Sequence, residues 1–402
     1  MTILCLASYE KGHRFLAECK RLGATVLLVT SLSLKDKARW PEGIDEIFYM
    51  PDNEHQWDRA HLVSAVSHLA RTHVFDRIVG LDDFDVETAA MLREHMRVPG
   101  SGDSTARYYR DKLAMRVKAR ESGPEFSIAV PDFIQILNYD RLREFMNRVP
   151  APWVLKPRSM AGAIGIKKVH SQEELWRLID KLGDQQSHYL LEHFVPGDIF
   201  HVDSVVFDRE IRFAIASGYG RPPMEVAQEG GVFTSRILDR ESPLAKELID
   251  ANAHVMASFG LVRGVSHTEF IRGQSDGLIY FLETSARVGG AHISDLIEAA
   301  TGLNPWAEWA KLELAETAAD YPTPQPRPDY AGLLVSLARQ QHPDLSGFSD
   351  PEIVWRMEEE YHAGLIVRSP SLARVEELLA AYTDRVKRDF WAYAPAKDRP
   401  TN

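Results

Sequence analysis

The sequence contains very little cysteine and no long hydrophobic run. Its only cysteines, Cys5 and Cys19, cannot build a disulfide framework, a cysteine metal site or a CxxC redox pair, so we expect two buried core thiols. No apolar run approaches the length of a membrane span, and the first residues lack the basic region of a signal peptide. These absences argue against a membrane partner and favour a cytoplasmic protein.

Positive charge is also scarce. Lys and Arg number 47 against 58 Asp and Glu, which gives a net charge of −11. A duplex nucleic acid requires a basic surface, so we expect no nucleic-acid partner, although a local basic pocket for a phosphate is compatible with this total. The composition, 45% hydrophobic and 26% charged, is ordinary for a globular protein, and a chain of 402 residues predicts two or three domains.

Some motifs of well-known sites are missing. No GxGxxG follows the first predicted strand, which argues against a dinucleotide site there. The glycine-rich loop at 159–165 is not closed by GKS or GKT and is therefore not a Walker A sequence. No GxSxG occurs, and neither cysteine has a matching histidine context, so a covalent nucleophile is not evident.

The first hundred residues alternate apolar runs with helical stretches. We predict strands at 3–7, 25–30, 47–50 and 77–81, and helices at 13–22, at 58–72 and through 95. Repeated βαβ order predicts a parallel sheet that helices cover on both faces.

We expect an α/β protein of three units: an N-terminal parallel α/β domain over 1–100, a central domain over 101–315, and a small C-terminal α+β unit over 329–402. Alternate prolines in 321–328 predict an extended linker before the last unit. The segment 218–233 is rich in glycine and proline, and we expect it to cover or line a substrate site.

Two acidic residues lie on the neighbouring strands of a predicted hairpin. Glu269 belongs to the run 265–271 and Glu283 to the run 278–284, with turn formers between them. The midpoint of the two glutamates falls in the turn, so a simple hairpin places the carboxylates opposite each other, about 5 Å apart at Cβ. Two like charges this close are tolerable if a hard cation such as Mg2+ lies between them, which implies a nucleotide phosphate nearby. A solvated edge hairpin is the alternative.

A lysine and a loop of small residues form a second candidate site. Lys156 ends a predicted strand, and Ser159, Gly162 and Gly165 lie in the loop that follows. Such a loop lets backbone N–H groups approach an anion without side-chain obstruction, and the next strand, 166–169, predicts a hairpin that covers phosphates. An ordinary hairpin turn is the alternative.

The segment from Glu192 onward is a candidate for binding the base and sugar of a nucleotide. Glu192 precedes Val195 by three residues, so the segment presents a carboxylate and a backbone edge to an adenine, and Asp198 is placed to reach ribose hydroxyls. A strand end that enters a turn is the simpler interpretation of these residues alone. Lys112, taken by itself, is most simply a solvated helix lysine.

His267 and Arg287 lie close in the sequence to the two glutamates. His267 shares a strand face with Glu269 because side chains alternate along a strand. A lone histidine there is usually a satisfied core residue, but beside two metal carboxylates we expect it to line the pocket. Arg287, followed by Gly289 and Gly290, suits bidentate pairing with a carboxylate or a phosphate, and a surface salt bridge is the alternative.

The order of these parts resembles that of the ATP-grasp superfamily over about residues 100–310. The matching motifs are Arg110-Asp-Lys112, Val154-Leu-Lys-Pro157 with its glycine-rich loop, Glu192-His-Phe-Val-Pro-Gly197, His267-Thr-Glu-Phe270 and Glu283-Thr-Ser-Ala-Arg287. Each motif has little specificity alone, and the five in the family's order are specific together.

This resemblance implies the ATP-grasp fold, with ATP and Mg2+ (or Mn2+) as cofactors. In the family, lysines at the positions of Lys112 and Lys156 hold ATP phosphates. The acid at Glu192 and the chain at Phe194 and Val195 hold the adenine.

The resemblance also implies a metal site, and one position departs from the family pattern. Acids at the positions of Glu269 and Glu283 bind Mg2+, and the arginine at Arg287 acts on phosphate or on a substrate carboxylate. Many members read Glu-x-Asn-x-Arg, where the Asn is a further metal ligand, and Ser285 stands at that place here. We expect Ser285 to hold a second metal weakly or through a water molecule.

The motif that starts at His267 and the ending Glu-Thr-Ser-Ala-Arg-Val-Gly-Gly look most like the bacterial L-amino-acid ligases, the dipeptide synthases. The implied reaction joins a small carboxylate to a small amine through an acyl phosphate, with Arg287 and His267 at the catalytic centre. A homodimer is expected by the same resemblance. Two other functions stay open: a biotin-carboxylase-like or purine-pathway ligase, and a catalytically silent ATP-binding regulatory protein, toward which only Ser285 points.

Overall fold

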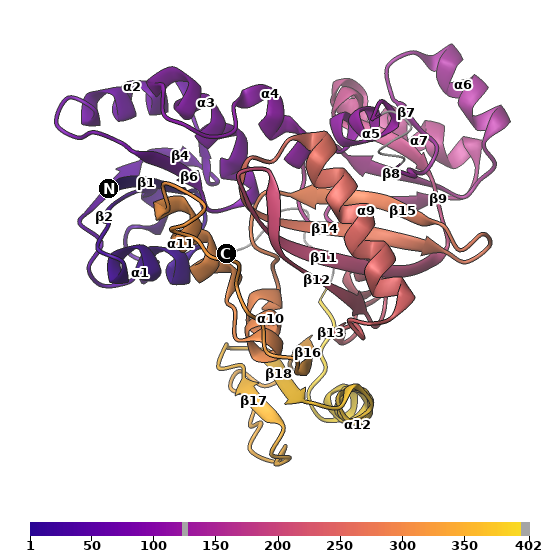
Figure 1. Cartoon of the computed structure of the whole chain (residues 1–402). Coiled ribbons are helices and arrows are strands. Elements are labelled where there is room, and N and C mark those ends of the chain that lie inside the picture. Colours follow the sequence, from indigo (N-terminus) through magenta and orange to yellow (C-terminus); the bar gives the residue numbers. More distant parts are fainter. Residues whose placement is uncertain (123–127, 395–402) are drawn as a thin grey trace.

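The N-terminal part of the computed structural model, which describes residues 1–122 and 128–394, contains a parallel four-stranded sheet in the order β3-β2-β1-β6 (Figure 1). The predicted parallel sheet is therefore confirmed. Cys5 and Cys19 are both free and buried in its core, as expected. The elements are β1 (Thr2–Ala7), α1 (His13–Arg21), β2 (Thr25–Ser31), η1 (Leu32–Leu34), β3 (Glu46–Met50), β4 (Asp52–Asn53), β5 (Gln56–Trp57), α2 (Arg59–Leu69), β6 (Arg77–Gly80), η2 (Asp83–Asp85) and α3 (Val86–Met96).

A second sheet of four strands follows, in the order β7-β10-β8-β9. Its helices begin where the sequence provides caps: the side chain of Asn138 accepts from the N–H of Arg141 at 3.0 Å, and Ser171 accepts from the N–H of Glu174 at 3.1 Å. The elements are α4 (Asp103–Ala106), η3 (Arg107–Tyr109), α5 (Lys112–Arg120), β7 (Phe133–Gln135), α6 (Tyr139–Arg148), β8 (Trp153–Pro157), β9 (Lys167–Val169), α7 (Gln172–Leu182), η5 (Gly183–His188) and β10 (Tyr189–His193).

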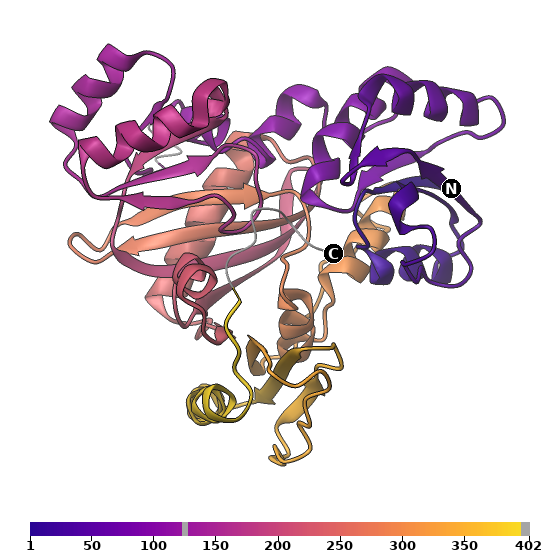
Figure 2. The ribbon, with the colours of Figure 1, turned by 180° about the vertical axis from the view of Figure 1, so that it is seen from behind.

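The largest sheet has eight strands in the order β15-β14-β11-β12-β13-β16-β18-β17, and its pairs are antiparallel. Figure 2 shows the four-stranded sheet β7-β10-β8-β9 lying beside the β14–β15 end of the eight-stranded sheet. The elements are β11 (Gly197–Phe207), β12 (Glu210–Tyr219), α8 (Pro223–Glu229), β13 (Phe233–Ile237), α9 (Pro243–Phe259), β14 (Arg263–Gly273), β15 (Ile279–Ser285), α10 (Ile293–Thr301), α11 (Pro305–Leu314), β16 (Tyr330–Leu337), β17 (Ile353–Arg356), β18 (His362–Ser369) and α12 (Leu372–Asp389).

The three predicted units are closely joined. Strand β16 pairs with β13, so the C-terminal strands continue the central sheet rather than form a separate one. Helix α11 packs on the N-terminal part, where the rings of Phe15 and Trp309 lie 5.1 Å apart. The domain boundaries at 100, 315 and 329 remain our proposal, and residues 395–402 of the last unit lie outside the described residues.

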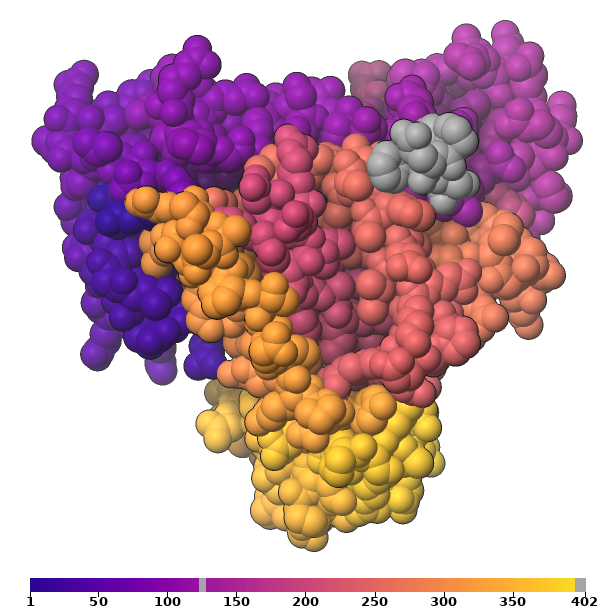
Figure 3. Space-filling view, in the orientation of Figure 1, coloured from indigo at the N-terminus to yellow at the C-terminus, as the bar shows by residue number. Residues whose placement is uncertain are grey.

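The proline-rich connection is fixed to the protein along its course. Tyr321 is buried and donates to Glu308 at 2.7 Å, and the N–H of Arg327 donates to the carbonyl of Thr301 at 2.8 Å. Figure 3 shows orange residues running over the surface from the indigo N-terminal part to the yellow C-terminal part. Within residues 1–122 and 128–394, no helix combines the length and the apolar character that crossing a membrane requires.

Candidate active site

The predicted acid pair lies on two paired strands. Glu269 of β14 and Glu283 of β15 are direct partners in the antiparallel register, as the position of the turn predicted. The register then shifts between Glu269 and Phe270, which leaves Leu282 as an extra residue. Both glutamates and Leu282 line a cavity of about 800 Å³.

The remaining walls of this cavity come from three other segments. The sheet β7-β10-β8-β9 and the glycine-rich loop form one wall. The turn between β10 and β11 forms a second wall, and helix α8 forms a third. Predicted site residues that line the cavity, besides the two glutamates, are Lys156, Gly162, Glu192, Phe194, Val195 and Asp198. The structure thus brings these predicted residues into one cavity. The other predicted site residues, including His267, which we expected to line the pocket, are not in its lining: Lys112, Ser159, Gly165, His267, Ser285 and Arg287.

Lys156 and Glu192 form a buried ion cluster with Arg116. The Nζ of Lys156 lies 2.6 Å from one Glu192 oxygen, and the Nε of Arg116 lies 2.7 Å from the other. Burial lowers the pKa of Lys156 to about 8, although Glu192 opposes this change. Burial works against the charge of Glu192, but Arg116 and Lys156 outweigh it and hold that pKa below its usual value. Both Glu192 oxygens therefore already face a cation, Oε1 facing Arg116 and Oε2 facing Lys156.

Lys112 is buried rather than solvated. Its Nζ lies 2.8 Å from Oε2 of Glu283 and donates to the carbonyl of Met160 at 2.6 Å. Arg110 donates to the carbonyl of Ser159 in the same loop, which is how Ser159 enters the site. These two bases of the Arg110-Asp-Lys112 motif therefore fasten the glycine-rich loop beside the acid pair.

The glycine-rich loop needs its glycines at two positions. Gly162 and Gly165 have φ angles of +60° and +72°, a region that favours glycine. A Cβ at Gly165 would lie 2.8 Å from a side-chain carbon of Pro157. The β8–β9 hairpin that carries this loop agrees with the prediction, and the role of the loop in holding phosphate remains a prediction.

Arg287 is turned toward the N-terminal part of the chain. Its Nε and Nη2 donate to Oδ2 of Asp83 at 2.8 and 2.5 Å. The salt bridge is therefore partly buried rather than on the surface, and it joins residues 204 positions apart. Burial opposes the charge of Asp83, but Arg287 and Arg110 hold its pKa well below the usual range. The Ser285 hydroxyl also lowers this pKa, and its role toward a second metal remains a prediction.

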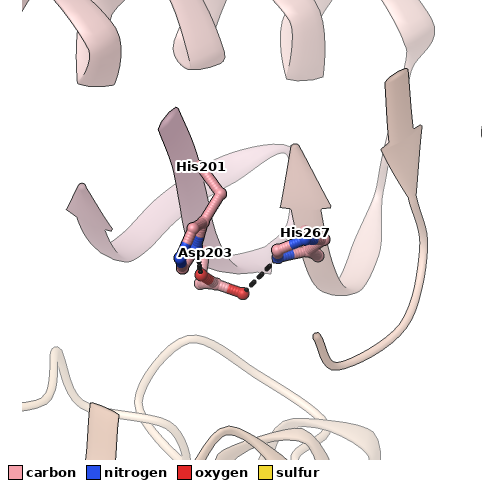
Figure 4. Close-up of side chains that lie close together, drawn as sticks. All are labelled: His201, Asp203 and His267. Atoms are coloured by element: carbon pink, nitrogen blue, oxygen red, sulfur yellow. Dashed lines mark hydrogen bonds and ion pairs between the residues drawn. The ribbon is translucent and has the colours of Figure 1, made fainter. Parts of the chain in front are cut away.

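His267 belongs to a buried hydrogen-bonded network. Figure 4 shows Asp203 between two histidines: His201 Nδ1 lies 2.7 Å from one carboxylate oxygen and His267 Nδ1 lies 2.9 Å from the other. His267 Nε2 lies 3.7 Å from Glu269, so the shared strand face is confirmed. Burial opposes a charge on His267, but Asp203 and Glu269 outweigh it and raise the pKa to about 9.

This network has the donor types of a metal site, but its atoms already bond one another. The ligand atoms of the three residues lie within 4.8 Å of one another, and both Nδ1 atoms are engaged by Asp203. Gly289 is required here, because a Cβ would lie 2.9 Å from His267 Nδ1 and 3.1 Å from Asp203.

Several residues of the site were missed from the sequence. Arg116 lies four residues after Lys112, hence on the same helix face, and this spacing was the available signal. His201 and Asp203 alternate on β11 and so share a face. Asp83 gave no local signal, because its partner comes from another domain.

Comparison with known proteins agrees with this arrangement. An L-arginine-specific L-amino acid ligase of Bacillus subtilis is 28% identical over 275 residues, which cover 64% of this chain and 65% of the relative. Alanine–anticapsin ligase of Bacillus subtilis (strain 168) is 22% identical over 282 residues, 64% of this chain and 57% of the relative. The chain thus spans less than two thirds of the length of these relatives. No family model matches the sequence.

Solved structures match the chain over nearly its whole length. An L-amino acid ligase from Bacillus licheniformis superposes with a TM-score of 0.77 at 16% identity, covering 98% of each chain. A carboxyaminoimidazole ribonucleotide synthase from Aspergillus clavatus, complexed with ATP, superposes with a TM-score of 0.71 at 15% identity, covering 96% of this chain and 98% of the other. This chain has the ATP-grasp fold. The resemblance and the fold class expected from the five motifs are confirmed.

Proposed function

We propose that this protein is an ATP-dependent carboxylate–amine ligase that joins amino acids, or an amino acid and a related small acid or amine. One observation carries the proposal. Glu269 and Glu283 face each other on one wall of a cavity whose other walls contain buried Lys156 and the glycine-rich loop. Facing acids next to buried bases suit a metal–triphosphate.

The residues present fit a hard divalent cation and a nucleotide. Carboxylate oxygens of Glu269 and Glu283 are the donors that Mg2+ or Mn2+ prefers, and Ser285 lies two residues beyond on the same strand face. The cation, when bound, would neutralise phosphate charge. Glu192 lines the cavity beside Phe194 and Val195. We assign the adenine to Glu192, Phe194 and Val195.

Two further assignments complete the nucleotide site. Asp198 is exposed at the start of β11 and lines the same cavity, and we assign it to the ribose hydroxyls. We assign Lys112, Lys156 and the loop at Ser159, Gly162 and Gly165 to the phosphates. The bonds of Lys112 and Arg110 to this loop would keep its backbone N–H groups in place.

The proposed reaction proceeds in two steps. A carboxylate oxygen of the first substrate attacks the γ-phosphorus of ATP, which gives an acyl phosphate and ADP. The amine of the second substrate then attacks the acyl carbon, the C–O bond to phosphate breaks, and the amine loses a proton as the amide forms. The protein contributes chiefly by positioning and by neutralising charge, and we assign Arg287 and His267 to the catalytic centre.

The relatives support amino acids as substrates, since two of them are described as L-amino acid ligases. Their partial coverage leaves the identity of both substrates to experiment. A cytoplasmic location belongs to this proposal, and a homodimer remains a prediction.

Phosphate release from ATP, measured with and without amino-acid mixtures and followed by mass spectrometry of the products, tests the proposal. We expect release that amino acids stimulate, together with an amide product. Release that requires bicarbonate or a phosphorylated amine would instead indicate a biotin-carboxylase-like or purine-pathway reaction. Tight ATP binding without stimulated release would indicate a nucleotide-binding regulatory protein.

A further inference from the structure

The segment 220–232, here called the flap, forms one wall of the cavity. It contains α8, and its residues Pro222, Met224 and Glu225 line the cavity. Gln228 donates to the carbonyl of Ile166, at the end of the glycine-rich loop, at 2.9 Å. The flap therefore contacts the loop that we assign to phosphate.

The flap has an internal brace and a glycine hinge. Arg221 donates to the carbonyl of Gly230 at 3.3 Å and to the carboxylate of Glu229 at 2.7 Å, which ties its two ends together. Gly230 and Gly231 have φ angles of +77° and +142°. The brace favours movement as one unit, and the glycines allow backbone rotation where the flap joins β13.

The strands on either side of the flap, β12 and β13, are here called its roots. Each root forms a hydrogen bond with the buried side of the site. At the first root, the Tyr219 hydroxyl at the end of β12 donates to Glu269 Oε1 at 2.7 Å. At the second root, the hydroxyl of Ser235 on β13 lies 2.8 Å from Nε2 of His201.

The His201–Asp203–His267 network connects these two roots. Asp203 bonds both histidines (Figure 4), and His267 Nε2 lies 3.4 Å from the Tyr219 hydroxyl. The result is a continuous chain of buried polar groups from β13 through β11 and β14 to β12, here called the circuit. In a low-dielectric interior, breaking one such bond leaves a costly unpaired group, so the members move together or not at all.

We propose that this circuit couples the flap to the carboxylate of Glu269. In the coupled state the flap is seated, that is, packed against the cavity, and the Glu269 carboxylate is held in position to bind a metal ion. His201, Asp203 and Ser235 are positioning residues in this proposal. It rests on the proposed function only in that Glu269 receives a metal–nucleotide. The coupling is reciprocal: a ligand that fixes Glu269 seats the flap, and a seated flap favours that ligand.

Hydrogen–deuterium exchange of the full chain tests the coupling without measuring turnover. Exchange in peptides that cover 220–232 is compared with and without Mg2+ and a non-hydrolysable ATP analogue. In the wild type we expect the ligand to slow exchange in the flap. In Ser235→Ala we expect the protected flap to exchange about fivefold faster, the effect of losing one buried hydrogen bond, and half-maximal protection to require more Mg2+.

Ser204→Ala is the matched control. Ser204 and Ser235 are similarly buried, 3% and 1% exposed. Ser204 lies on β11 next to Asp203 but outside the circuit, and its hydroxyl accepts from Asn252 at 2.6 Å. We expect this variant to keep the wild-type protection and Mg2+ requirement. If both variants loosen the flap equally, or if neither does, the coupling is wrong.

Tyr219→Phe provides a second route if Ser235→Ala does not fold. It removes one oxygen from the other root and should also loosen the flap. Its control is Tyr280→Phe, which removes a hydroxyl bonded to Asp276 in the exposed turn. A wild-type flap that does not respond to Mg2+ and the analogue would overturn the coupling, whereas the absence of an amide product in the turnover assay would overturn only the proposed ligase activity.

Discussion

The ammonium group of Lys112 connects two parts of the candidate site, because it lies 2.8 Å from Glu283 and donates to the carbonyl of Met160. One side chain thus joins a proposed metal ligand to the proposed phosphate loop. A buried lysine in this position balances the charge of the acid pair and holds the loop over the cavity.

Lys112→Ala should weaken binding of Mg·ADP by about tenfold or more, since hydrogen bonds to charged groups contribute roughly 1.5–3 kcal/mol. Isothermal titration calorimetry measures the change. Lys118→Ala, on the same helix, is the control because Lys118 lies over the ring of Tyr108 and away from the acid pair. Equal affinities of the two variants would remove Lys112 from the nucleotide site.

Glu283→Ala should abolish turnover, because the metal loses one of two facing anionic ligands. The assay is phosphate release at several Mg2+ concentrations. Glu210→Ala is the control, since Glu210 is exposed on β12 and pairs with Arg212. Substantial residual activity with an unchanged Mg2+ dependence would contradict the assignment of Glu283.

Lys156→Ala should weaken ATP binding and also destabilise the fold. Removing one partner of a buried ion pair costs about 3–5 kcal/mol, and here Glu192 would keep only Arg116. Urea unfolding and calorimetry separate the two effects. Lys167→Ala, an exposed lysine on β9 of the same hairpin, should change neither. An unaltered nucleotide affinity in a folded Lys156→Ala protein would exclude this residue from the site.

Asp83→Asn should lower kcat/KM by about tenfold or more while leaving Mg·ADP affinity near the wild-type value, because Arg287 loses a charged anchor. The comparison needs turnover and calorimetry on the same preparation. Asp76→Asn, which alters an aspartate bonded to the backbone of Thr2, controls for loss of charge in the same domain. An equal loss of nucleotide affinity would indicate that Asp83 acts on the cavity itself.

Asp85→Asn should stabilise the protein more at pH 8 than at pH 5. Burial raises the pKa of Asp85 to about 7, and Asp82 adds to the increase. As pH rises from the ordinary aspartate pKa to 7, the folded state keeps a proton that the unfolded state has lost, so folding stability falls across this window. Asparagine carries no charge and can still accept from the N–H of Ser8.

The expected gain at pH 8 is on the order of a few kcal/mol. Thermal unfolding at both pH values measures it, with Asp36→Asn, an exposed aspartate of the same domain, as the control. A difference between variant and wild type that is the same at pH 5 and pH 8 would show that Asp85 stays charged in the folded protein.

Features that depend on neighbours in the chain could be predicted. The register of Glu269 and Glu283 followed from the turn residues and the two-residue period of strands, both of which act within one hairpin. The side chains of Asn138 and Ser171 cap the helices that follow them, an interaction that acts within one turn and that a sequence can show. Lys112 alone appeared solvated, because its burial comes from Glu283 and Met160, which lie far along the chain.

The amino-acid sequence by itself determined the strands and helices, the facing acids and the glycine-rich hairpin, since short-range sterics, capping and periodicity specify them. Only the tertiary structure decided that Arg287 meets Asp83, 204 residues away, and that two histidines share Asp203 beneath the flap. These partners depend on how whole sheets pack together, and packing over such distances leaves no mark in any local pattern of residues.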